Sequence, residues 1–228
     1  MPEQEDLKSR EECYRCRKAK VMCYCAQIKP FASDPEFVIL IHPKETRKAI
    51  NTGRMAFLNL QNAKLLVGND FSGDPSLSRL LNDPSKRCYL LFPGPAAIDI
   101  HDLPCSPSDR AGKAGLSDVF IILDATWSMA KKMFRLSQNL QKIPQVMFKP
   151  EKASEFLIRQ QPGFDCYSTI ETIHHMIELR ANGHDAAAPH HHLLHIFRDM
   201  VQKQIDYENG AFSTESPALS QNRLSPSH

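Results

Sequence analysis

The order of apolar and polar positions along the chain predicts an alternation of strands and helices. Short apolar runs rich in β-branched residues are typical of strands buried on both faces of a parallel sheet. Residues 119–123 form such a run, and further strand candidates occupy 37–41, 64–68, 89–92 and 146–148. Apolar positions at helical spacing predict helices at 45–60, 75–81, 127–137, 169–180 and 191–207. The alternation indicates an α/β fold with a mostly parallel sheet flanked by helices.

The stretch from 118 to 135 is the centre of this pattern. Its apolar run ends at Asp124, and a helical pattern starts at Trp127, with Ala130 on the same predicted face. Thr126 or Asp124 can cap that helix. A helix cap followed by a core tryptophan is the structural alternative. Because ligands of open α/β sheets bind at the carboxyl ends of strands, we expect the chemistry here.

Composition limits the class of protein. Hydrophobic residues make up 42% of the 228 residues, which is enough for a sizeable core. No apolar stretch approaches the roughly 20 residues of a membrane span, and the first ten residues are too polar for a signal peptide. We therefore expect a cytoplasmic protein that does not enter a membrane. A net charge of only +2 does not by itself announce a nucleic-acid partner.

Four cysteines form a compact cluster near the start of the chain. They follow the pattern Cys13-x-x-Cys16 and Cys23-x-Cys25, and four thiolates at such spacing can close a tetrahedral, structural zinc site. Accidental clustering or a redox pair is the alternative. The predicted organisation is a tail and zinc knuckle at 1–30, a catalytic domain at 31–208 and a disordered tail at 209–228. A mobile loop is expected at 96–116, which is rich in Pro, Ser, Asp and Gly.

Further motifs follow the strands. The strand at 89–92 leads into Pro93-Gly94, where main-chain groups could recognise a ligand or simply form a tight turn. Ser168 to Glu171 reads as a capping box. Between His42 and Gly53 a strand joins a basic helix, whose cations either contact phosphate or form a solvated face.

The remaining histidines and cysteines are interpreted as structural residues. The histidines at 190–192 and 195 are interpreted as a solvated helix start, because no partners at ligand spacing are visible. Cys88, Cys105 and Cys166 are scattered and are expected to be ordinary. There is no G-x-G-x-x-G after a strand and no Walker lysine loop, which argues against classical dinucleotide or nucleoside-triphosphate binding.

The motifs taken together, in order, resemble the DTW-domain family. They are C-x-x-C-x6-C-x-C, His42-Pro with Asn51-Thr-Gly53, Leu91-Phe-Pro-Gly94, Asp124-x-Thr-Trp127 and Ser168-Thr-Ile-Glu171. The resemblance covers about residues 13 to 205. It implies a tRNA-uridine aminocarboxypropyltransferase that moves the 3-amino-3-carboxypropyl group of S-adenosylmethionine to N3 of a tRNA uridine, releasing methylthioadenosine. It also implies a fold related to the knotted SPOUT methyltransferases.

The resemblance, with the chemistry of the residues, assigns roles. Asp124 is expected to take the proton from uracil N3, beside Thr126 and Trp127. The expected residues of the S-adenosylmethionine site are Leu91, Phe92, Pro93, Gly94, Leu123, Asp124, Ala125, Ser168 and Thr169. The expected zinc ligands are Cys13, Cys16, Cys23 and Cys25. The expected tRNA contacts are Arg15, Arg17, Lys18, Arg47, Lys48, Asn51, Thr52, Arg54, Lys131, Lys132 and Arg135.

Two competing functions stay open at this point. An RNA methyltransferase would use the same S-adenosylmethionine on the same fold. A zinc-bearing RNA-binding module would need no catalytic acid, and Asp124 at the end of an apolar strand argues against it. The sequence does not determine the oligomeric state, the tRNA position or the set of tRNAs.

Overall fold

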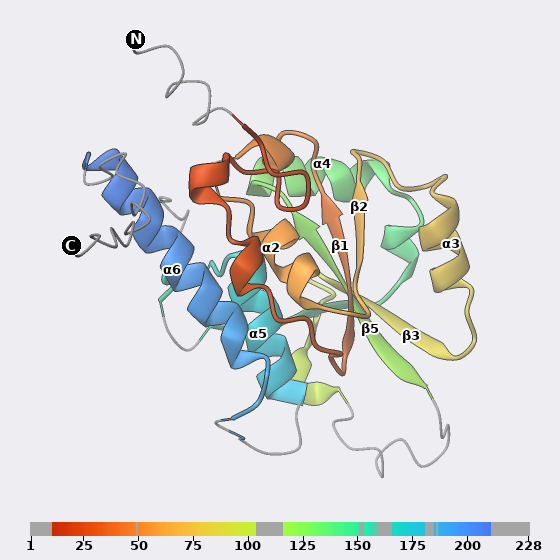
Figure 1. Cartoon of the computed structure of the whole chain (residues 1–228). Coiled ribbons are helices and arrows are strands. Elements are labelled where there is room, and N and C mark those ends of the chain that lie inside the picture. Colours follow the sequence, from red (N-terminus) through yellow and green to blue (C-terminus); the bar gives the residue numbers. More distant parts are fainter. Residues whose placement is uncertain are drawn as a thin grey trace, which may run out of the picture.

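A parallel sheet with helices on both faces forms the body of the molecule (Figure 1). The computed structural model describes residues 11–210 except 49, 104–115, 151–152, 157, 159–165, 181–184 and 186. Within these residues the sheet has six strands in the order β2-β1-β5-β3-β6-β4, and every neighbouring pair is parallel. The strands are β1 (Glu36–Ile41), β2 (Lys64–Val67), β3 (Lys86–Leu91), β4 (Ile98–Asp99), β5 (Ser117–Asp124) and β6 (Gln145–Met147).

The helices divide between the two faces because successive strand residues point to opposite sides of the sheet. Phe37 and Ile39 of β1 pack in one core, whereas Val38 and Leu40 pack in a second. The first core is covered by α2 (Thr52–Asn59), α5 (Thr169–Arg180) and α6 (His191–Glu208), and the second by α3 (Pro75–Leu81) and α4 (Trp127–Leu136). The apolar strands β1 and β5 are therefore buried on both sides. The predicted strand at 64–68 forms β2 at the sheet edge instead, where Val67 is exposed.

Most predicted elements are confirmed, but the helix expected at 45–60 is wrong at its start. The α-helix begins at Thr52, and Glu45–Arg47 forms a separate 3-10 turn. Asn51 causes the division. Its Oδ1 accepts a hydrogen bond from the Arg54 amide at 2.7 Å, and its Nδ2 donates to the Glu45 carbonyl at 2.7 Å. An asparagine that caps the following turn favours a new helix start over continuation of the old one.

The segment expected to be a mobile loop contains a strand. β4 pairs in parallel with β6, and Ile100–Asp102 follows as a 3-10 turn with Ile100 buried. Residues 104–115 of that predicted loop lie outside the described residues, as do 1–10 and 211–228 of the two predicted tails.

The cysteine-rich segment packs on the side of the sheet that α2, α5 and α6 cover. Cys16, Met22 and Tyr24 are buried in the same core as α5 and α6. The domain division at residue 30 stays a prediction, and so does the knot that the resemblance implies. None of the helices in the described residues has the length and apolar character needed to cross a membrane.

A buried ion pair at the start of β5 supports a stability prediction. The Asp118 carboxylate lies 2.6 Å from Arg87 Nη2 and 2.9 Å from Arg180 Nη2, and the Asp118 and Arg180 side chains are 1% and 2% exposed. Replacing Asp118 with alanine is expected to lower the free energy of unfolding by about 3–5 kcal/mol, because it leaves buried positive charge uncompensated. Chemical denaturation measures this value.

The matched control is Glu36→Gln, which removes the ion pair with Lys86 at a more exposed place. It should cost no more than about 1 kcal/mol. If the two variants lost equal free energy of unfolding, the buried ion pair would not be the more important of the two for stability.

Candidate functional site

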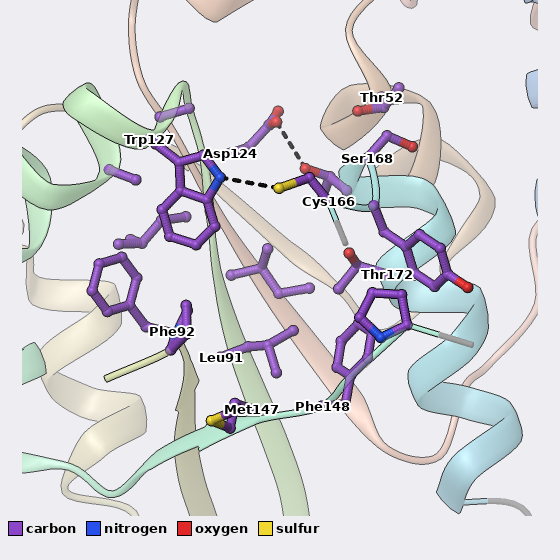
Figure 2. A pocket seen from close by; sticks show the side chains of 18 of the residues that line it. Thr52, Leu91, Phe92, Asp124, Trp127, Met147, Phe148, Cys166, Ser168 and Thr172 are labelled. Atoms are coloured by element: carbon purple, nitrogen blue, oxygen red, sulfur yellow. Dashed lines mark hydrogen bonds between the residues drawn. The ribbon is translucent and has the colours of Figure 1, made fainter. Parts of the chain in front are cut away.

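A cavity of about 310 Å³ lies at the carboxyl ends of β3, β5 and β6, next to the first turns of α2, α4 and α5 (Figure 2). This volume is within the range of small-molecule sites. One wall is mainly apolar, and polar groups gather where β5 ends. The lining residues are Thr52, Leu91, Phe92, Pro93, Ile122, Leu123, Asp124, Ala125, Thr126, Trp127, Ala130, Val146, Met147, Phe148, Pro150, Cys166, Tyr167, Ser168, Thr169 and Thr172.

Asp124 is fixed at this junction by its neighbours. Its backbone carbonyl accepts a hydrogen bond from the His42 amide at 3.1 Å, which ties the end of β5 to the end of β1. Its Oδ1 accepts the Thr169 hydroxyl at 2.8 Å (Figure 2). The residue is 7% exposed. Asp124 is thus a nearly buried carboxylate that borders the cavity in a single, held orientation.

The first turn of α2 completes the surroundings of this carboxylate. A Cβ atom placed on Gly53 would come within 2.2 Å of Asp124 Oδ2 and 2.8 Å of its Cγ. The carboxylate therefore occupies the space that any other residue at position 53 would need. The amino end of a helix favours negative charge, so this position suits an ionised carboxylate.

We expect Gly53→Ala to lower the free energy of unfolding by about 1–3 kcal/mol, because the new methyl group displaces Asp124 in a packed interior. In an ordinary helix the same change would stabilise by about 1 kcal/mol. Thermal or chemical denaturation decides between the two signs. Gly73→Ala is the matched control, since nothing lies within 4 Å of its new Cβ, and a stabilised Gly53→Ala variant would contradict the close approach.

Trp127 forms part of the cavity wall and is not the core tryptophan of the structural alternative. It is 38% exposed, while Ala130 and Met133 are the buried residues of α4. Its indole Nε1 donates a hydrogen bond to Cys166 Sγ at 3.4 Å, and its ring lies 6.0 Å from that of Phe92 (Figure 2). Thr126 occupies the N-cap position and lines the cavity, but it makes no side-chain cap bond; its hydroxyl pairs with that of Ser128 at 3.3 Å.

The predicted capping box at the start of α5 forms in part: Glu171 accepts from the Ser168 amide, but the Ser168 hydroxyl bonds the Glu171 carboxylate and not a backbone amide. The Ser168 amide and hydroxyl both donate to Glu171 Oε2, at 2.8 and 2.6 Å. Glu171 also accepts from the Ser154 hydroxyl at 2.8 Å, which fastens a preceding segment to the helix start. Of the two hydroxyls assigned to the donor site, that of Ser168 is committed to this box and that of Thr169 to Asp124.

Several residues of the cavity were not found from the sequence. Met147, Phe148, Pro150, Cys166, Tyr167 and Thr172 line it. Met147 ends β6 and Phe148 follows it, just as Asp124 ends β5 and Phe92 follows β3, and that position was a usable signal. Cys166 had been read as ordinary. Gly94, which was predicted, is not among the lining residues, and a Cβ there would lie 3.0 Å from Gln145 Oε1.

The four predicted zinc ligands come together. The Sγ atoms of Cys13 and Cys25 are 3.6 Å apart, those of Cys16 and Cys23 are 3.7 Å apart, and all four lie within 4.8 Å of one another. Thiolates about 2.3 Å from a tetrahedral zinc ion would be separated by about 3.8 Å. The donor set therefore fits zinc.

The predicted tRNA-contacting residues divide by exposure. Lys18 is buried and donates to the Lys48 carbonyl, which holds the knuckle against the next loop, and burial lowers its pKa. Asn51 is the cap of α2, and Thr52 is buried at the cavity. Arg54 is half-buried. The exposed members are Arg15, Arg17, Arg47, Lys48, Lys131, Lys132 and Arg135.

The prediction of a solvated histidine stretch without ligand partners is wrong. His190 is 6% exposed, and His174, Glu178, His190 and His191 offer ligand atoms within 4.8 Å of one another. Burial, together with the neighbouring imidazoles, lowers the pKa of His174 to about 3 and also lowers that of His190. The partners come from α5, which the spacing within the histidine stretch could not indicate.

The sequence is similar to known proteins of one family. A family model described as the DTW domain matches residues 10–205. A Drosophila melanogaster protein named tRNA-uridine aminocarboxypropyltransferase 2 is 31% identical over 170 residues, which is 72% of this chain and 64% of that protein. Proteins of the same name from Macaca fascicularis and Mus musculus are 31% and 28% identical, over 73% of this chain and 55% of theirs.

No solved structure matches the chain. The chain spans less than two thirds of the length of these curated relatives. The family model, however, covers most of this sequence, including the cysteine cluster, the end of β5 and the capping box. The chain belongs to the DTW-domain family.

Proposed function

We propose that this protein transfers the 3-amino-3-carboxypropyl group of S-adenosylmethionine to N3 of a uridine in tRNA, releasing methylthioadenosine. The observation that carries the proposal is Asp124, a held and nearly buried carboxylate that borders a ligand-sized cavity at the carboxyl edge of the sheet. Family membership supplies the reaction class, because the curated relatives bear the name of this transferase.

The cavity has the composition that an adenosine-bearing donor requires. Leu91, Phe92 and Ile122 form an apolar wall on β3 and β5, and Val146 and Phe148 extend it on the β6 side. The purine and the methyl-sulfonium end would pack on such a wall, while the polar amino-acid end would lie toward the first turn of α5. A preformed site of this kind contributes to the rate mainly by orienting the reacting carbon.

Asp124 would act as the proton acceptor. Uracil N3 bears a weakly acidic proton, and a carboxylate within hydrogen-bond reach can remove it as the N–C bond forms. The Thr169 hydroxyl holds the carboxylate in one rotamer. When bound, S-adenosylmethionine supplies the γ-carbon of its amino-acid arm. The N3–C bond forms, the C–S bond breaks with its electron pair going to sulfur, and neutral methylthioadenosine leaves.

The tRNA would approach the side of the cavity bordered by Trp127. N3 is on the base-pairing edge of uracil, so the uridine must be unpaired or turned out of its stack. Lys131, Lys132 and Arg135 are exposed on α4, the helix that begins with Trp127. Arg47 and Lys48 are exposed between β1 and α2. Phosphate contacts by these cations would make tRNA binding weaken as salt rises.

The zinc ion would be structural. Four thiolates fill its coordination sphere and leave no open position for a substrate. Its part would be to hold the loop that carries Arg15 and Arg17 on the surface and Lys18 against the Lys48 carbonyl. Lys18 thus contacts the loop before α2, and Thr52, the first residue of α2, borders the cavity.

Nucleoside analysis tests the proposal. The protein is incubated with unmodified tRNA and S-adenosylmethionine, and the digested nucleosides are separated and weighed by mass spectrometry. We expect uridine carrying an aminocarboxypropyl group, together with methylthioadenosine in equal amount. A methyl adduct with S-adenosylhomocysteine would instead identify a methyltransferase. Binding of tRNA with neither product would leave a zinc-bearing RNA-binding module.

A further inference from the structure

A second cluster of potential metal ligands lies where α5 is followed by α6, and the proposed transfer reaction makes no use of it. Its members are His174 and Glu178 on α5 and His190 and His191 at the start of α6. The two helices pack side by side on the same face of the sheet (Figure 1). One ligand atom from each of the four residues lies within 4.8 Å of the others.

The hydrogen bonds around His191 and His174 direct lone pairs toward each other. His191 Nε2 lies 3.0 Å from the Asp185 carbonyl, to which it can only donate, so Nδ1 carries the lone pair. His174 Nδ1 lies 3.5 Å from Glu178 Oε2, which favours a proton on that nitrogen. His174 Nε2 and His191 Nδ1 are 3.1 Å apart. With these tautomers, two lone pairs face each other and a cation between them would satisfy both.

His190 supplies an independent observation. The residue is 6% exposed, and its Nε2 is buried with no hydrogen-bond partner among the described residues. Leaving such a group without a partner costs about 1–3 kcal/mol, so its presence calls for a function. The imidazole ring of His190 lies 5.1 Å from that of His174 and 4.2 Å from that of His191, measured between centroids.

We infer that His174, His190, His191 and Glu178 form a metal site that takes Zn²⁺ or a related transition-metal ion. Two nitrogens about 2.0–2.1 Å from a tetrahedral ion would be about 3.3 Å apart, close to the observed separation of the first pair. Imidazole-rich sites suit zinc, copper and nickel, whereas magnesium and calcium prefer oxygen. Glu178 either completes the tetrahedron or orients His174, as carboxylates commonly do for metal-bound histidines.

The ion would act as a clamp between two helices. It would tie the second half of α5 to the first turn of α6. The other end of α5 begins with Thr169, which holds Asp124. The Glu178 and His191 side chains are 27% and 38% exposed, so an ion can enter from solvent.

Metal counting on the full chain tests the site. Protein stripped of metal is reloaded with a small excess of Zn²⁺, freed of unbound ion and analysed by mass spectrometry for zinc per chain. We expect two equivalents of zinc for the wild type, one in the cysteine cluster and one in the histidine cluster. His191→Ala should bind one, and His195→Ala should bind two, because His195 is an exposed residue of the same helix outside the cluster.

Co²⁺ separates the two sites by spectroscopy. Thiolate ligands give a sulfur-to-cobalt charge-transfer band, which His191→Ala should keep while losing the absorption of the second ion. A wild type that binds one equivalent, or a His191→Ala variant that binds as much as the wild type, would overturn the inference.

A measurement on the unaltered protein covers the case in which the variant fails to fold. Addition of Zn²⁺ should shift the imidazole ¹⁵N resonances of His174, His190 and His191, and should leave that of His195 in place. Unchanged resonances in the three rings at saturating Zn²⁺ would also refute the site.

Discussion

Replacing Asp124 with asparagine should lower the rate of aminocarboxypropyl transfer by about 10²–10⁴-fold, the range that a positioned general base contributes. The change preserves the size of the side chain and its ability to accept the Thr169 hydroxyl at 2.8 Å. It removes only the capacity to take up a proton from uracil N3. Quantified product formation over time, at saturating tRNA and S-adenosylmethionine, measures the effect.

The dissociation constant for S-adenosylmethionine separates this role from a structural one. Calorimetric titration of Asp124→Asn should give a value close to that of the wild type, because the apolar wall of the cavity is unchanged. Thr169→Val, which frees the carboxylate to rotate, should cause a smaller loss of rate. Asp206→Asn, on a helix that does not line the cavity, is the matched control. Full transfer activity in Asp124→Asn would refute the assignment.

Cys16→Ser should produce the largest loss of stability. The residue is fully buried and shares a core with Tyr24, Met22 and the helices of one sheet face. Loss of a metal site is among the few mechanisms that cost more than about 4 kcal/mol. For a chain of this size that corresponds to a fall of about 8–16 °C in Tm. Thermal unfolding with bound zinc, measured alongside the zinc content, records both effects.

Cys88→Ser is the matched control for the cysteine cluster. Cys88 is a half-buried cysteine of β3 outside both ligand clusters of the described residues. Its replacement should shift Tm by much less and leave the zinc content unchanged. A Cys16→Ser variant that keeps the wild-type Tm and zinc content would contradict a structural role for the four thiolates. A strong chelator should lower the Tm of the wild-type protein at least as far as Cys16→Ser does.

The principal strands were predictable because a strand buried on both faces must be apolar at consecutive positions. The runs at 119–123 and 37–41 both satisfy that condition and lie next to each other in the sheet. β4 was missed because it has two residues and lies at the sheet edge, where its sequence is that of a loop. The start of α2 was misplaced because it depends on a hydrogen bond from the Arg54 amide to the Asn51 side chain. The spacing of apolar residues does not reveal such a bond.

The cysteine cluster and the capping box were also predictable, since all of their members lie within a few residues of one another. Short spacing fixes which groups can meet, whatever the rest of the chain does. The sequence by itself therefore determined the α/β class, the cysteine cluster and the place of Asp124 at a strand end.

Only the tertiary structure decided which distant groups meet. It placed Gly53 against Asp124, Trp127 against Cys166, and His174 beside His190 and His191. Each of these contacts joins elements whose relative position depends on how the helices pack on the sheet. A hydrophobic pattern specifies which face of an element is buried, but it does not specify the neighbour against which that face is packed.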